Sequence, residues 1–452
     1  MEGWGLLVVA AAILLYAALS RWLATTVVSA AMVFVAVGLV TGPEGFDWLH
    51  LRADSAPVRA LAEATLTFVL FSDASRIDLR RLRREYGLPV RLLAVGLPLT
   101  IALGTVVAMP MFPALTGIEA LCLAIVLAPT DAALGQAVVT DEHVPGRIRQ
   151  SLNVESGLND GICVPLLFVA LAVAEADAGT ISGAHALRVV VEEIGYGVVG
   201  GVLAGVIGVV LLGAALRRGL ADETWTRVGV AATAAACYGL AAPPGGSGFI
   251  AAFVGGAVFG GMARRTGVAA LANEPGALIE ELGALLNAAT FVVFGAVILG
   301  PALGDFGADS VVYAALSLTV IRMVPVAIAL VGSDAKPPTI AFLGWFGPRG
   351  LASIVFGVII VKEAHLPHTD VLIQTVIATV ALSVVAHGVS AVPAAKRYTR
   401  WYTAHPGRHE LMEAQPASHQ RWRRGGIAPR RGPGRRVSGA TWRREPPSSP
   451  GP

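Results

Sequence analysis

The chain has 452 residues, of which 55% are hydrophobic and 14% are charged, and its formal net charge is +3. A soluble globular domain has about a quarter of its residues charged, so this composition excludes a soluble protein and indicates a polytopic membrane protein. The three cysteines, Cys122, Cys163 and Cys237, stand singly in apolar stretches without the spacing of metal ligands. We expect them to be small buried apolar side chains.

Windows of about 19 residues predict about thirteen transmembrane helices, so the expected fold class is an all-α polytopic membrane protein. Lys and Arg concentrate in the odd-numbered connections, including a cluster at 76–84. The positive-inside rule then places the N-terminus outside and the C-terminus in the cytoplasm. The predicted spans are 4–20, 23–41, 58–74, 88–112, 117–139, 148–174, 189–216, 226–243, 247–262, 280–300, 309–331, 338–361 and 369–392.

Residues 394–452 differ in composition from the rest of the chain. Pro, Gly, Ser and Arg cluster there, as in RWRRGGIAPRRGPGRR, without apolar periodicity. Such a segment cannot bury enough apolar surface to offset the entropy cost of folding. We therefore expect a transmembrane domain at 1–393 and a basic disordered cytoplasmic tail at 394–452, which either lies on anionic lipid or is simply solvated.

Two of the predicted helices contain helix-breaking residues at membrane depth. The fifth span contains Pro129, followed by Thr130 and Asp131, and the twelfth contains GWFGPRG at 344–350. Proline removes a helix hydrogen bond and glycine tolerates unusual backbone angles, so both helices are expected to unwind. If the seventh span is a linker, the two breaks fall in the fifth members of two six-helix halves. The sequence thus predicts two inverted repeats with paired interrupted helices at a transport site.

Polar side chains also interrupt the sixth span. Ser156 shares a helix face with Asp160, four residues later, and Glu155 does so with Asn159. An ionisable side chain near the bilayer centre costs roughly 2.5 to 3.5 kcal/mol on insertion scales, so such residues indicate a functional site. A carboxylate in a partly desolvated pocket binds either a proton or a hard monovalent cation, and this competition is sufficient for coupled exchange. Asp160 is the candidate for that carboxylate.

Four sequence motifs resemble those of one transporter family: LFSDASRIDLRRLRR at 70–84, TDA at 130–132, ESGLNDG at 155–161 and GPRG at 347–350. Over roughly residues 1–395 the chain resembles the monovalent cation:proton antiporter-1 family, the NhaP-type bacterial sodium/proton exchangers. The most specific element is the pair Asn159 and Asp160. The resemblance implies a homodimer in the cell membrane, with a rigid dimerisation half and a mobile core in which the two broken helices cross. Its implied role is pH and sodium homeostasis.

The resemblance also implies ligand roles. Asp160 would bind the cation and the proton in turn, with Ser156 and Thr130 as further oxygen ligands of Na+. Asp73 would add a carboxylate from the third span, although its place at the cytoplasmic end of that span leaves a solvated interfacial Asp as an open alternative. One acid beside an amide, where electrogenic relatives have two acids, implies electroneutral one-for-one exchange.

Other residues are expected to shape the site. Glu155 and Arg349 carry opposite charges that the membrane would penalise, so we expect an ion pair between them, and we expect Asn159 to be held by it. Asp131 is expected to compensate the dipoles of converging helix ends. The family pattern often has Pro after this acid, and here the residue is Ala132.

Two further positions have open interpretations. Arg322, within the eleventh span, either pairs with an acid of the core or has a structural role. His387, near the end of the last predicted span, is either a pH sensor or an ordinary interfacial His.

Two alternatives to sodium/proton exchange remain. Because the sequence does not decide between Na+, Li+ and K+, the same fold would also suit K+/H+ antiport. The rival from another class is an intramembrane aspartic hydrolase using Asp131 and Asp160, but neither the YD nor the GxGD segment of such enzymes surrounds these aspartates. No phosphate loop or nucleotide fingerprint is present. We expect no enzymatic activity, no cofactor and no nucleic-acid partner, and we expect monovalent cations, protons and membrane lipid as partners.

Overall fold

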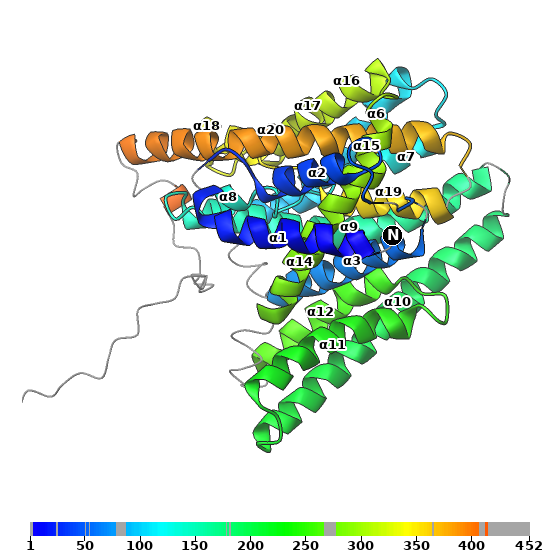
Figure 1. Ribbon diagram of the computed structural model, residues 1–452, viewed down its shortest axis with the longest axis vertical. Helices are drawn as coiled ribbons and strands as arrows, with labels where there is room; N and C mark the ends of the chain where they lie inside the picture. Colours follow the sequence, from blue (N-terminus) through cyan, green and yellow to red (C-terminus); the bar gives the residue numbers. More distant parts are fainter. Residues whose placement is uncertain are drawn as a thin grey trace, which may run out of the picture. The chain divides into compact units, whose positions relative to one another are not determined.

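The structure is a computed structural model that describes residues 3–23, 26–49, 51–53, 55–77, 87–177, 179, 182–265, 277–363, 366–405 and 412–414. Within these ranges every regular element is a helix, which confirms the predicted all-α class (Figure 1). Residues 417–452 form a separate unit that lies outside the described residues. The disorder predicted for that part of the tail therefore stays a prediction.

Helices occupy each of the predicted spans of the first half. The fourth span includes a π-helical turn, and the fifth is interrupted by non-helical residues between α7 and α8. The elements are α1 (Gly3–Leu23), α2 (Ala30–Thr41), α3 (Ala56–Arg76), α5 (Gly87–Arg91), η1 (Leu92–Gly96), α6 (Leu97–Met111), α7 (Gly117–Val126), α8 (Gln136–Val139), α9 (Gly146–Asp177) and α10 (Gly183–Arg217).

The second half follows the predicted ranges in the same way. A second π-helical turn, η2, continues α14, and α16 and α17 together occupy the eleventh span. The elements are α11 (Glu223–Ala241), α12 (Gly248–Arg265), α14 (Ala277–Val293), η2 (Phe294–Leu299), α15 (Gly300–Ala302), α16 (Ala308–Leu318), α17 (Val320–Ala329), α18 (Pro337–Trp345), α19 (Leu351–Glu363), α20 (Thr369–Ala404) and the 3-10 turn η4 (Met412–Ala414).

Among the described residues, seven continuous helical stretches are long and apolar enough to cross a membrane, and three apolar helices are shorter. This establishes a multi-span membrane protein. The total of thirteen spans and the inverted relation of the two halves stay predictions.

Helical structure continues past residue 393, where the boundary between the membrane domain and the tail is predicted; the boundary itself stays a prediction. Helix α20 continues to Ala404. Tyr398 stacks on Phe342, with ring centroids 4.3 Å apart, and Trp401 packs against Tyr398. Further on, Glu413 is buried, and its Oε1 accepts a hydrogen bond from the Thr339 hydroxyl at 2.6 Å. The start of the basic segment is ordered because these side chains have partners on α18 and α20, which composition alone does not reveal.

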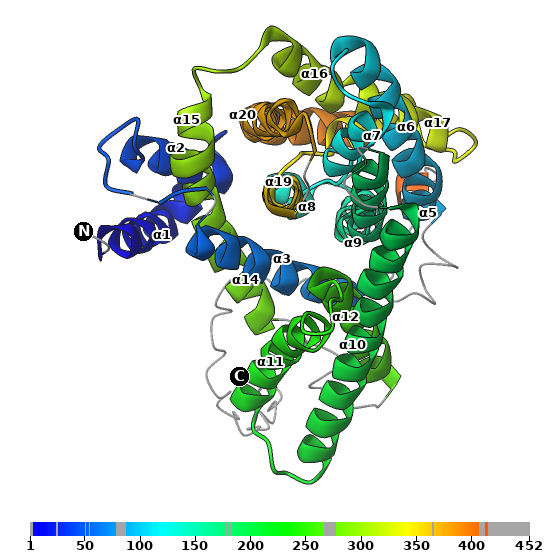
Figure 2. The same cartoon turned by 90° about the vertical axis from the view of Figure 1, so that its right-hand side faces the viewer.

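Helices α10 and α12 pack backbone to backbone, and α11 lies beside both (Figure 2). Gly197, Gly201 and Gly205 are spaced four residues apart on α10 and face α12. A Cβ at Gly201 would lie 2.4 Å from the Ala251 carbonyl oxygen. Small residues at this spacing allow the close helix contacts that stabilise membrane proteins, where lipid removes most of the hydrophobic driving force.

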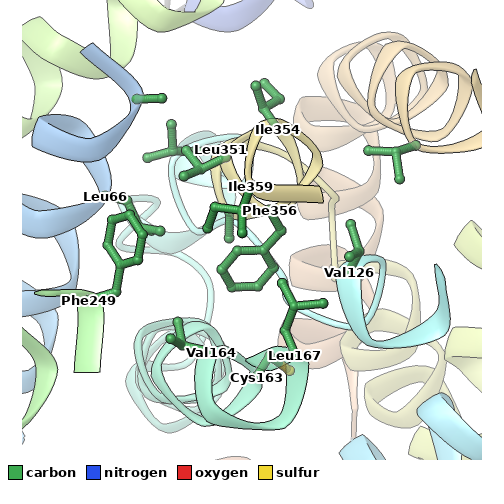
Figure 3. Packing of buried hydrophobic residues seen from close by; sticks show 14 of the residues in the cluster. Leu66, Val126, Cys163, Val164, Leu167, Phe249, Leu351, Ile354, Phe356 and Ile359 are labelled. Atoms are coloured by element: carbon green, nitrogen blue, oxygen red, sulfur yellow. The ribbon is translucent and has the colours of Figure 1, made fainter. Parts of the chain in front are cut away.

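Helix α19, the second half of the broken twelfth span, lies among the other helices. It contacts α3, α7, α14 and α20, and in Figure 2 these surround it as it is viewed nearly along its axis. Figure 3 shows Phe356 of α19 facing Val164 and Leu167 of α9, with Val126 of α7 nearby. Phe356 is fully buried. A helix in this place obtains its packing partners from both halves of the chain.

We predict that Gly201→Ala destabilises the protein, because its Cβ would meet the α12 backbone, which cannot rotate away. Overpacking of this kind costs about 1–3 kcal/mol, so the melting temperature in detergent should fall by several degrees. Gly195→Ala on the same helix is the matched control, since nothing lies within 4 Å of its Cβ position. Equal melting temperatures for the two variants would contradict the close packing.

Candidate functional site

The two predicted helix breaks are present. Helix α7 ends at Val126 and α8 begins at Gln136, so the segment with Pro129, Thr130 and Asp131 is not helical. Helix α18 ends at Trp345 and α19 begins at Leu351, so residues 346–350 are unwound as well. Non-helical backbone at membrane depth is tolerated only where protein surrounds it or where it lines a cavity.

The two unwound segments bind each other. The Asp131 amide donates a hydrogen bond to the Pro348 carbonyl oxygen at 2.8 Å. The Asp131 carboxylate accepts from the amide of Leu351 at 3.0 Å and from that of Ala133 at 2.8 Å. The carboxylate therefore lies at the N-terminus of α19, where a negative charge is favourable. The hydroxyl of Ser353 donates to the Val126 carbonyl oxygen at 2.8 Å and joins the ends of α7 and α19.

Helix α9 brings the polar residues of the sixth span against the first break. The Ser156 hydroxyl donates to the Thr130 carbonyl oxygen, and the Asn159 amide donates to the Thr130 hydroxyl at 2.8 Å. All three residues and Asp160 are buried. Oδ1 of Asp160 has no hydrogen-bond partner among the residues that the structure describes. The arrangement gathers hydroxyl, carbonyl and carboxylate oxygens at one place inside the protein.

Asp73 of α3 packs against the same helix, α9. A Cβ at Gly157 would be 3.0 Å from Cβ and 3.4 Å from Oδ2 of Asp73, so the Asp73 side chain packs closely against this glycine. Asp73 and Asp131 are also the acids that interact electrostatically with Asp160. Although Asp73 is near the end of α3, it packs against protein beside the Ser156 and Asp160 turn.

A small cavity adjoins these residues. Thr130, Asp131 and Ser156 line one part of it, and Val138 and Val139 of α8 line another. Asp160 is not among the residues that line it. The described residues contain no cluster of three or more His, Cys, Asp or Glu side chains suited to hold a resident metal ion.

The chain matches the family described as sodium/hydrogen exchanger, transmembrane, over residues 8–397. It belongs to this family.

Two relatives and one solved structure illustrate the similarity. A probable Na+/H+ antiporter of Schizosaccharomyces pombe is 27% identical over 261 residues, which cover 54% of this chain and 33% of that protein. The K+/H+ antiporter NhaP2 of Shewanella oneidensis is 23% identical over 81% of this chain and 62% of its own length. The chain thus spans about a third to three fifths of these relatives. The sodium proton antiporter MjNhaP1 of Methanocaldococcus jannaschii has the same fold, with a TM-score of 0.67, 19% identity, and coverage of 88% of this chain and 98% of that one.

The buried ion pair of this exchanger-family chain differs from the predicted one. Glu155 Oε1 lies 2.6 Å from Nη1 of Arg322 on α17, and both side chains are only 3% exposed. The predicted pair of Glu155 with Arg349 is therefore wrong in its partner. Asn159 is likewise held by Thr130 rather than by the predicted pair. Arg322 lies on α17, one span before the broken one that contains Arg349, and the sequence gives no spacing that would choose between the two arginines.

Arg349 is held mainly through the backbone of its own segment. Its guanidinium donates to the Gly347 carbonyl oxygen, and its amide donates to the Ser383 hydroxyl at 2.7 Å. The side chain is fully buried. Arg349 thus stabilises the unwound turn by a hydrogen bond, whereas the direct ion-pair partner of Glu155 is Arg322.

His387 was expected near a helix end, but it is fully buried in the interior of α20. Its Nε2 lies 2.9 Å from the Trp345 carbonyl oxygen. A sequence signal for this was present and missed. Thr375, Thr379, Ser383 and His387 are spaced four residues apart in an otherwise apolar span, so they form one polar stripe, and all four are buried.

We predict that Glu155→Gln destabilises the protein strongly, because Arg322 would remain buried without its counter-charge. Breaking a buried pair in this way costs about 3–5 kcal/mol. The measurement is thermal unfolding in detergent. Glu192→Gln is the matched control, since its pair with Arg188 is exposed and should contribute little.

A double variant, Glu155→Gln with Arg322→Gln, should lose less stability than the sum of the two single changes. Additive losses would show that the two side chains do not stabilise each other.

Proposed function

We propose that the chain is a secondary active antiporter that exchanges Na+ for H+, driven by the proton gradient. The observation that carries this proposal is the buried Asp160 carboxylate, whose Oδ1 has no hydrogen-bond partner among the described residues. On α9, Asp160 is one helical turn after Ser156, whose hydroxyl donates to the Thr130 carbonyl oxygen at the crossing of the two unwound segments. A buried carboxylate without hydrogen bonds is costly unless it takes up a proton or a cation.

Competition at Asp160 is the proposed coupling step. With a proton on Asp160, the pocket loses the negative charge that attracts a cation. With the proton released, Asp160, Ser156 and Thr130 supply the hard oxygen ligands that alkali cations prefer. Because the two ligands exclude each other, cation binding releases the proton. Asp73, which packs beside Ser156 on α9, is proposed as a further oxygen ligand.

Access to the site is proposed to alternate between the two sides of the membrane. The small cavity beside Thr130 and Ser156 reaches α8, whose end leads into the 140–145 connection. The excess of Arg in the odd-numbered connections supports a cytoplasmic location for that end. We therefore propose that the structure represents the state in which the cation site is open to the cytoplasm.

A K+/H+ antiporter of the same fold is the second candidate, because a relative with that name matches 81% of this chain. The hydrolase alternative is less well supported. Both carboxylate oxygens of Asp131 already accept backbone amide hydrogen bonds, from Ala133 and Leu351. An acid held in this way is poorly suited to share a proton with Asp160 as a catalytic dyad.

We further propose a homodimer in the plasma membrane with the C-terminal tail in the cytoplasm. Helix α1 supports an interface, because Leu6, Leu14 and Leu15 are 79%, 76% and 61% exposed. In the membrane this apolar surface faces either lipid or a second copy of the chain. No cofactor is required by the proposed exchange, since Na+ and H+ are the transported substrates.

We predict that Asp160→Asn abolishes exchange in proteoliposomes that contain an internal pH dye and carry an imposed proton gradient. The amide cannot bind and release a proton, so added Na+, Li+ or K+ should no longer dissipate the gradient. The control is Asp177→Asn, the same change at the exposed end of α9, which should transport like the wild type. Wild-type exchange by the Asp160 variant would rule out the proposed site.

We also predict that exchange is electroneutral, because Asn159 stands beside Asp160 where a second acid would add a charge. Clamping the membrane voltage with valinomycin and K+ should leave the Na+ response unchanged. A response accelerated or slowed by voltage would require a second transported charge, and Asp73 would be the first residue to substitute.

A further inference from the structure

The break in the twelfth span removes a particular backbone hydrogen bond. In a continuous helix the amide of Arg349 would donate to the Trp345 carbonyl oxygen, four residues earlier. Helix α18 ends at Trp345, so this bond is absent. The Gly347 amide donates to the Trp345 oxygen at 2.9 Å, but the Arg349 amide needs a partner elsewhere. At membrane depth such groups must be satisfied by protein.

Helix α20 supplies partners for both groups. The Ser383 hydroxyl accepts from the Arg349 amide at 2.7 Å, and the His387 ring lies 2.9 Å from the Trp345 oxygen through Nε2. Ser383 and His387 are four residues apart on one face of α20, as Trp345 and Arg349 are in the broken span. Two side chains one turn apart on the intact helix α20 thus provide partners for the Arg349 amide and the Trp345 carbonyl oxygen, which are not bonded to each other in the unwound turn.

The hydrogen bonds run in one consistent direction. The Trp345 oxygen can only accept, so His387 carries its proton on Nε2 and leaves Nδ1 as an acceptor. Nδ1 lies 3.2 Å from the Ser383 hydroxyl, which donates to it while accepting from the Arg349 amide. Nδ1 is also 3.1 Å from the Ser383 carbonyl oxygen, which cannot bond to an unprotonated nitrogen. A His387 ring with its proton on Nε2 thus gives the Trp345 oxygen a donor, while the Ser383 hydroxyl gives the Arg349 amide an acceptor.

The unwound turn is connected directly to the proposed cation site. Its Pro348 carbonyl oxygen accepts from the Asp131 amide, and Thr130, the preceding residue, is bound by Ser156 and Asn159. A shift of the turn would move Asp131 and with it the Thr130 oxygens.

We propose that Ser383 and His387 are positioning residues that hold the 346–350 turn and thereby fix the geometry of the cation site. The inference rests on the proposed function, because the site it positions is the one proposed for Na+ and H+.

The first test compares transport kinetics of Ser383→Ala and His387→Phe with the wild type. Loss of residues that orient metal ligands typically weakens affinity by about 10-fold or more, so the apparent KM for Na+ should rise about tenfold while the maximal rate per folded molecule changes less. His387→Gln should restore much of the affinity, because its amide retains a donor for the Trp345 oxygen. A merely structural role would lower the yield of folded protein and leave KM unchanged, and that result would overturn the proposal.

Thr379→Val is the matched control. Thr379 is one turn earlier on the same face of α20 and is equally buried, but its hydroxyl donates to the Thr375 carbonyl oxygen of its own helix. Its KM should equal that of the wild type. An equal rise of KM in this variant would show that loss of any polar side chain on this face of α20 has the same effect. That result would contradict a specific role for Ser383 and His387.

Hydrogen–deuterium exchange provides a readout that does not depend on transport. The backbone amides of 346–351 should exchange faster in Ser383→Ala and His387→Phe than in the wild type and in Thr379→Val. If wild-type vesicles show no cation/proton exchange, the proposed function fails, whereas this measurement still decides whether the pair holds the turn. Unchanged amide exchange in both variants would overturn the inference by itself.

Discussion

The structure depends on the requirement that backbone amides and carbonyls at membrane depth find partners within the protein. Hydrocarbon offers no hydrogen bonds, and each unsatisfied group costs several kcal/mol. Two helices of this chain nevertheless unwind. Asp131 satisfies the start of α19 and the Pro348 carbonyl, and Ser353 satisfies the end of α7. The unwound segments must therefore lie where other helices surround them. The 346–350 turn leads directly into α19, which α3, α7, α14 and α20 surround (Figure 2).

The same requirement applies to the buried charged side chains, most of which have a partner within the protein. Glu155 is neutralised by Arg322, and Asp131 is engaged by two backbone amides. Arg349 is tied to its own turn. Among the described acids of α9 and the two breaks, Asp160 is the one with a fully buried carboxylate oxygen that has no hydrogen-bond partner. Asp160 is therefore the carboxylate of this group that binding of a proton or a cation would stabilise most. The proposed exchange is based on this difference.

Close backbone packing and unwound backbone are separated within the fold. Helices α10 and α12 approach through glycines spaced four residues apart, an arrangement that leaves little room for either helix to shift. The polar crossing, by contrast, is held by side-chain hydrogen bonds from α9 and α20. Side-chain bonds can be exchanged at lower cost than interlocked backbones, so conformational change is expected at the crossing rather than between α10 and α12.

Local features of the sequence were enough to predict the helices, the two breaks and the polar positions of α9. Hydrophobic windows, Pro129, the GPRG turn and the spacing of Ser156 and Asp160 are local features, and local features persist in any fold of the chain. The partners of these groups became known only from the packing of the helices against one another. It paired Glu155 with Arg322 instead of Arg349, placed His387 in the interior and extended α20 past residue 393. These results depend on contacts between helices far apart in the sequence, where charge and spacing allow several pairings and packing selects one.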